Sequence, residues 1–158
     1  MSAGERTPLP EDRPRPAGEG SGAHDRPSGA GLGDAERYAQ GMAVRREVLG
    51  DAHVDRAIAG ASEFTADFQD FITRGAWGDI WSRPGLDRRS RSVAVLTAMI
   101  ALGHHEEFVM HVAAARRNGL TVDEIKEVIL QAAVYCGVPA ANTAFKLAAK
   151  ALEELGEL

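Results

Sequence analysis

A histidine on an amphipathic segment is the first candidate for chemistry in this sequence. His111 lies about one helical turn after Glu107 and Phe108, at the edge of the apolar side of its segment, and His104 lies two turns earlier. An imidazole in such a position can donate or accept a proton near neutral pH. The same position also suits a histidine packed in a core or an interface, so the spacing leaves both interpretations open.

The acidic and imidazole side chains around this histidine raise the question of a metal site. The segment contains His104, His105, Glu106, Glu107 and His111. His104 and His111 are two turns apart, which is wider than the four-residue spacing by which two histidines of one helix bind zinc. We therefore predict no metal site.

An arginine interrupts the apolar face of the helix predicted for residues 34–49. Tyr38, Met42 and Leu49 share that face, and Arg45 falls in its middle. A buried guanidinium needs a partner because leaving its charge unpaired is very costly. The partner could be a protein carboxylate or the carboxylate of a ligand, which a guanidinium matches with two parallel hydrogen bonds. The candidate protein carboxylates are Asp67, Asp79 and Glu124.

Further side chains could take part in a site but form no specific motif. Arg91 belongs to an arginine group at the start of a predicted helix, where anions are favoured, although a solvated surface is the simpler interpretation. Cys136 has no second cysteine for a dithiol cycle and suits a small packing residue. Glu127 projects away from the apolar face of its helix, toward solvent or another subunit. Tyr135 and Asn142 flank a Gly-Val-Pro break that could border a pocket.

The elements that must position these residues are all predicted to be helices. From Asp34 onward apolar residues recur at helical spacing, and no segment alternates with period two for long enough to form a strand. Asp34 is a predicted helix cap, Gly50 and Gly137 are predicted helix stops, and Thr121 begins a capping box. We therefore predict an all-α fold of about six helices.

Three segments carry more particular predictions. Residues 51–72 hold one apolar stripe and are predicted to form a single helix. Residues 75–85 are rich in glycine and proline without a helical period, which predicts a structured loop that holds both tryptophans. Residues 93–102 are apolar all round, which predicts a central helix buried on all sides. A chain of this size supplies few neighbours for such a helix, which suggests that subunits pack together.

Composition divides the chain and excludes several classes of function. Residues 1–33 contain five of the seven prolines and seven of the seventeen glycines, so we predict a disordered tail before a helical domain at residues 34–158. The formal net charge of -5 argues against nucleic-acid binding. No apolar stretch is long enough to span a membrane or to act as a secretory signal. A single cysteine fits a reducing compartment, so we expect a cytoplasmic protein.

Three strings together resemble the carboxymuconolactone decarboxylase family. They are YAQGMAVRREVLGDAHVD at 38–55, AWGDIWSRPGL at 76–86, and DEIKEVI at 123–129 with YCGVPAAN at 135–142. The resemblance implies the all-helical fold of the alkylhydroperoxidase D proteins and a homo-oligomer, either a trimer or a hexamer. Peroxidase relatives carry a CxxC pair before the matching histidine, and this chain has no such pair. The resemblance therefore does not imply a thiol peroxidase.

What the resemblance implies for activity is the decarboxylation of 4-carboxymuconolactone to 3-oxoadipate enol-lactone, in protocatechuate breakdown by the β-ketoadipate pathway. The lactone itself accepts the electron pair that CO2 leaves behind, so no cofactor is expected. The protein must hold a small dicarboxylate, stabilise the developing oxyanion and deliver a proton. Two alternatives stay open, namely another lactone-directed or alkylhydroperoxidase-type activity and a non-enzymatic helical oligomerisation module.

These tasks assign expected roles to the side chains already identified. Arg45 and Arg91 are expected to bind carboxylates, and Trp77 is expected to wall the pocket against water. His111 is the expected proton donor, with Tyr135 or Glu127 assisting. The expected catalytic residues are thus His111, Glu127 and Tyr135, and the expected substrate-binding residues are Arg45, Trp77, Arg91, Cys136 and Asn142.

Overall fold

The computed structural model describes residues 31–158, and every regular element in that range is a helix. The all-α prediction is confirmed, with seven α-helices and one π-helix in this range in place of about six helices. Nearly all of the predicted tail lies outside the described residues. None of the described helices is both long and apolar enough to cross a membrane. The elements are α1 (Asp34–Leu49), α2 (Asp51–Ala59), α3 (Glu63–Ile72), the π-helix η1 (Thr73–Trp81), α4 (Arg88–Leu102), α5 (His105–Arg117), α6 (Val122–Cys136) and α7 (Val138–Glu154).

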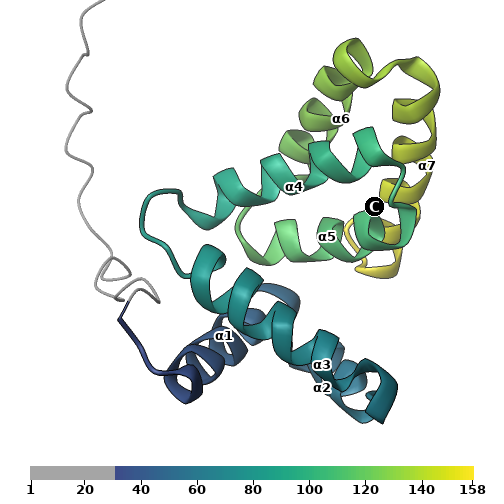
Figure 1. The fold of residues 1–158 in the computed structure, drawn as a ribbon. Helices are drawn as coiled ribbons and strands as arrows, with labels where there is room; N and C mark the ends of the chain where they lie inside the picture. The colour runs from purple at the N-terminus through teal and green to yellow at the C-terminus, as the bar shows by residue number, and fades with distance from the viewer. Residues whose placement is uncertain (1–30) are drawn as a thin grey trace, which may run out of the picture.

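The helices form two groups that share α5 (Figure 1). In the first group α1 packs along η1, and α2 and α3 flank them. In the second group α4, α5, α6 and α7 pack around the larger apolar core. A smaller core joins the groups, because Ala114 of α5 packs with Val54 of α2 and Trp77 of η1. Residues of α1, α2, η1 and α5 therefore pack together in this smaller core, which connects the two groups of helices.

Helix ends follow the predicted local chemistry. Gly50 and Gly137 both adopt positive φ angles, of 85° and 92°, which favour glycine over other residues. The capping box at Thr121 is present, since its backbone N–H donates to Glu124 at 2.7 Å and its hydroxyl accepts from the Glu124 N–H at 3.1 Å. At the start of α1 the cap is Gly33, and the predicted cap Asp34 is instead the first helical residue.

The prediction of a single helix over residues 51–72 is wrong, because this range contains two helices. α2 ends at Ala59, and α3 begins at Glu63 after a short break in which Ser62 caps the new helix. The Ser62 N–H donates to the Thr65 hydroxyl at 2.9 Å, so a serine–threonine pair restarts the helix where the apolar stripe alone suggested continuity. The stripe is not buried along α3 either, because its phenylalanine side chains are exposed. They are Phe64, Phe68 and Phe71.

The prediction of a loop over residues 75–85 is also wrong for most of that range, which is helical as far as Trp81. η1 continues α3 without interruption as far as Trp81, and only residues 82–87 connect it to α4. One glycine of this segment, Gly78, serves helix packing. A Cβ atom on Gly41 of α1 would collide with the Thr73 carbonyl oxygen and lie 2.9 Å from the Gly78 backbone nitrogen. Glycine thus lets the α1 and η1 backbones touch.

The prediction that residues 93–102 are buried on all sides is wrong for the single chain. Leu96 and Ile100 of α4 are buried against α5, α6 and α7, but Val93 and Leu102 are 39% and 66% exposed. Val134 and Tyr135 on α6 are exposed as well.

The contact between α1 and η1 predicts a specific stability difference between two glycines of this chain. Gly41→Ala should lower the free energy of unfolding by about 3 kcal/mol, because the methyl group has no space and the two backbones must separate. Gly75→Ala is the matched control. A Cβ atom at Gly75 would meet no other atom within 4 Å, and alanine favours helix by up to about 1 kcal/mol. Chemical denaturation of both variants measures the difference, and equal stabilities would contradict the close packing.

Candidate active site

Arg45 is the buried cation around which the candidate site is built. It lies on α1 and is only 4% exposed. Its Nη2 donates to the Gln69 side-chain oxygen at 2.9 Å and its Nη1 to the Thr73 hydroxyl at 3.3 Å. The Thr73 hydroxyl donates in turn to the Gln69 carbonyl oxygen at 2.7 Å, so the end of α3 and the start of η1 together hold the guanidinium. Burial lowers the pKa of Arg45, with Tyr38 acting in the opposite direction.

The carboxylates that could have neutralised Arg45 are engaged elsewhere or do not reach it. Asp79 pairs with Arg37, whose Nε donates to it at 3.0 Å, and Glu124 pairs with Arg89. Within residues 31–158 no carboxylate, Asp67 included, lies within ion-pair distance of Arg45. The Nε atom of Arg45 is buried without a hydrogen-bond partner.

An uncompensated charge of this kind is unusual because desolvating a guanidinium costs several kcal/mol, which is comparable to the net stability of a whole domain. The side-chain oxygens of Gln69 and Thr73 accept hydrogen bonds from the guanidinium but do not neutralise its charge. The arrangement therefore suits an anion that is supplied from outside the chain.

Aromatic rings line the site on the η1 side. Trp77 is 6% exposed and lies 5.3 Å from Trp81 between ring centroids. Trp81 stacks on His111 of α5, with centroids 6.4 Å apart and planes inclined by 10°. The π-helix places both tryptophans on the face that meets α5, and π-helical turns are frequent at functional sites. The predicted residues Arg45, Trp77 and His111 thus belong to one region of the fold.

His111 is largely removed from water. The pKa of His111 is lowered to about 4, chiefly because the imidazole is buried; His53 adds to the lowering and Glu107 acts in the opposite direction. The imidazole is therefore neutral at pH 7 in the free protein. A histidine whose pKa burial displaces this far is a candidate for a functional site.

Sequence reasoning missed three members of this site. Gln69 and Thr73 lie just before the segment predicted to form a loop, so their alignment with Arg45 depends on the unpredicted π-helix. His53 precedes the buried Val54 on α2 and is itself half-buried.

Arg91 is hydrogen-bonded to the segment that connects η1 to α4, and its predicted role in carboxylate binding stays a prediction. Its guanidinium donates to the Leu86 carbonyl oxygen at 3.1 Å and to the Arg83 carbonyl oxygen at 3.0 Å. Burial lowers its pKa, and Arg83 adds to that effect. In this conformation the Arg91 side chain holds the segment that connects η1 to α4, just after Trp81.

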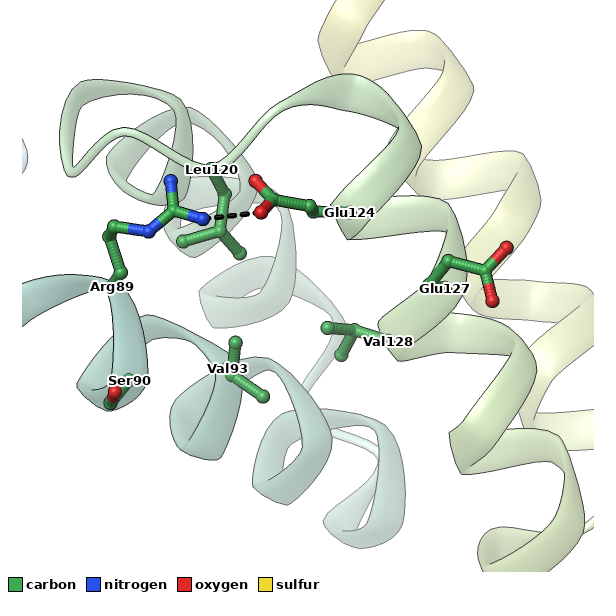
Figure 2. A pocket seen from close by; sticks show the side chains of 7 residues that line it. All are labelled: Arg89, Ser90, Val93, Leu120, Glu124, Glu127 and Val128. Atoms are coloured by element: carbon green, nitrogen blue, oxygen red, sulfur yellow. Dashed lines mark hydrogen bonds and ion pairs between the residues drawn. The ribbon is translucent and has the colours of Figure 1, made fainter. Parts of the chain in front are cut away.

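The remaining predicted residues lie on α6 and α7, which pack with α4 and α5 rather than with α1 or η1. Tyr135 is 81% exposed, Asn142 is exposed and Cys136 is half-buried. Glu127 lies at an open groove of about 300 Å³ between α4 and α6, and Figure 2 shows its carboxylate directed away from α4. The single chain does not join these four residues to the Arg45 cluster, and their predicted roles stay predictions.

The groove between α4 and α6 is a separate feature from the Arg45 cluster. Its walls include Val93, Leu120 and Val128, and the Arg89–Glu124 ion pair crosses one end (Figure 2). Both charged groups there are already paired with each other, so this ion pair offers no free cation for a carboxylate. Within residues 31–158, no three histidine, cysteine or acidic side chains are grouped so as to hold a metal ion.

Comparison with known proteins agrees with the geometry. A 4-carboxymuconolactone decarboxylase of Acinetobacter baylyi is 46% identical over 125 residues, which are 79% of this chain and 93% of that protein. A nitrosuccinic acid decarboxylase of Metarhizium robertsii is 40% identical over 118 residues, or 75% of this chain and 82% of that protein. A 4-carboxymuconolactone decarboxylase of Pseudomonas putida is 52% identical over 48 residues, which cover 30% of this chain and all of that sequence. The family model for carboxymuconolactone decarboxylases matches residues 66–150, and this chain belongs to that family.

Proposed function

We propose that this protein decarboxylates 4-carboxymuconolactone to 3-oxoadipate enol-lactone without a cofactor. The observation that carries the proposal is Arg45, a buried guanidinium with no protein carboxylate within ion-pair distance in residues 31–158 and with an unused Nε–H. The substrate brings two carboxylates, and a relative that bears this activity in its name aligns with most of the chain. In this proposal a carboxylate of the substrate pairs with the positive charge of Arg45.

The chemistry proposed for the site uses the substrate as its own electron sink. As CO2 departs, the electron pair of the breaking C–C bond moves through the ring double bond into the lactone carbonyl. A proton then adds to the carbon next to that carbonyl. Arg45 holds one carboxylate, Trp77 and Trp81 exclude water from the ring, and His111 delivers the proton.

Two further parts of the proposal concern residues outside this cluster. Arg91, Glu127, Tyr135, Cys136 and Asn142 remain proposed site residues, and those on α6 and α7 could join the site only across subunits. We also propose a homo-oligomer, trimeric or hexameric, supported by the exposed apolar side chains of α3, α4 and α6. Size measurement in solution, for example by light scattering, tests this directly.

The direct test of the reaction is incubation of the purified protein with 4-carboxymuconolactone and no added cofactor, with release of CO2 as the readout. We expect turnover. Nitrosuccinic acid serves as the second arm because one relative is named for it. Turnover of nitrosuccinic acid alone would replace the proposed substrate while leaving the reaction type intact, and turnover of neither compound would refute the proposal.

A first substitution tests carboxylate binding by Arg45. Arg45→Gln should raise KM about 10- to 100-fold, because a charge-assisted hydrogen bond contributes about 1.5–3 kcal/mol. The matched control is the neighbouring Arg46→Gln, since Arg46 is engaged with Asp51 and Asp55 on the surface. Steady-state kinetics on both variants, with circular dichroism to confirm folding, gives the answer. An unchanged KM in folded Arg45→Gln would remove Arg45 from substrate binding.

A second substitution tests proton delivery by His111. His111→Gln should lower kcat about 10²- to 10⁴-fold, the usual contribution of a general acid. His105→Gln is the control, because His105 lies on the same helix with an exposed side chain. Turnover numbers measured at saturating substrate separate this effect from binding. Undiminished kcat in a folded His111→Gln protein would mean that another group supplies the proton.

A further inference from the structure

His53 is a second imidazole beside His111, on an element that the proposed reaction has not used. Val54, the next residue on α2, is fully buried against Trp77 of η1 and Ala114 of α5. Ala114 lies one turn after His111 on the same helix. This shared core holds α2 and α5 near each other, and the two histidines are close enough for the charge on one to act on the other.

The turn before α2 lies against the side chain of Arg117 at the end of α5. A Cβ atom on Gly50 would lie 2.9 Å from the Arg117 guanidinium carbon, so that side chain rests directly on the Gly50 backbone. The φ angle of 85° at Gly50 also favours glycine at this turn. The start of α2 and the end of α5 therefore lie close together.

The charges that face the two imidazoles are mostly positive. Arg45 on α1, Arg56 on α2 and Arg117 on α5 all lower the pKa of His53, after the larger effect of its burial. For His111, His53 lowers the pKa and Glu107 on α5 raises it. η1 contributes the uncharged ring of Trp81. These positive charges disfavour protonation of either histidine until an anion binds nearby.

This electrostatic arrangement conflicts with the demands of the proposed reaction. Loss of CO2 from a dianion gives a monoanionic product only if one proton is consumed. With a pKa of about 4, only about one His111 in a thousand carries a proton at pH 7. The free protein therefore has almost no stored acid at His111, and the proton must arrive together with the substrate.

We propose that His53 and His111 form a two-imidazole proton store, which takes up one proton from solvent when a dicarboxylate binds beside Arg45. The two negative charges of the ligand offset the positive charges that face the imidazoles and favour imidazolium. In the reaction an N–H bond of the pair breaks as the new C–H bond forms, and the pair returns to its neutral state. The last step rests on the proposed function, whereas proton uptake on binding does not.

NMR of the imidazole ring C–H groups tests the store without any turnover. In the protein with succinate as a non-reactive dicarboxylate, the resonances of His53 or His111 should move at pH 7 to their protonated positions. In the free protein, His53→Gln should raise the pKa of His111, whereas His104→Gln, at an exposed position, should leave it unchanged. The proposal would be overturned if the imidazole resonances did not shift when succinate is added. It would also be overturned if the pKa of His111 were the same in His53→Gln as in the wild type.

Kinetics supply a second readout. Because formation of the productive complex takes up a proton, kcat/KM should fall by up to about tenfold per pH unit above neutrality while kcat stays nearly constant. In His53→Gln, kcat should fall, and the pH dependences of kcat and kcat/KM should become more alike. Parallel pH profiles of kcat and kcat/KM in the wild type would contradict the store. Succinate-induced protonation without any decarboxylation would instead refute the proposed function and leave the store in place.

Discussion

The burial of the Arg45 guanidinium, with no carboxylate of residues 31–158 within ion-pair distance, is the constraint on which the rest of the site depends. To hold that charge, the chain places Gln69 and Thr73 beside it, and this requires α3 to continue into η1 at the correct angle. η1 in turn must lie directly against α1, which the glycines Gly41 and Gly78 permit. The close packing of these two helices is therefore what holds Arg45 in the position from which we propose that it binds an anion.

The sequence predicted the fold class and the unusual position of Arg45 because both depend on local patterns. Apolar residues at helical spacing require helices, and an arginine amid apolar neighbours must be buried wherever its helix packs. The capping box at Thr121 and the stop at Gly50 follow from backbone chemistry that acts within one turn. Such signals do not need knowledge of the partner helix.

What the sequence could not predict depends on contacts between distant residues. Gly78, one of the glycines that indicated a loop at residues 75–85, serves the α1–η1 contact, which is visible only once the two helices are docked. Gln69, Thr73 and His53 are ordinary polar residues until Arg45 and His111 are placed beside them. Arg91, by contrast, suited anion binding by its position at a helix start, yet the fold uses it to hold a connecting segment.

A crystal structure with succinate bound would show directly whether Arg45 receives an anion from outside the chain. We predict one succinate carboxylate within hydrogen-bond distance of the Arg45 guanidinium, between the tryptophan wall and the two histidines. Succinate in the groove between α4 and α6 with Arg45 still unpaired would contradict this role, as would a protein carboxylate that closes on Arg45 in the assembled protein.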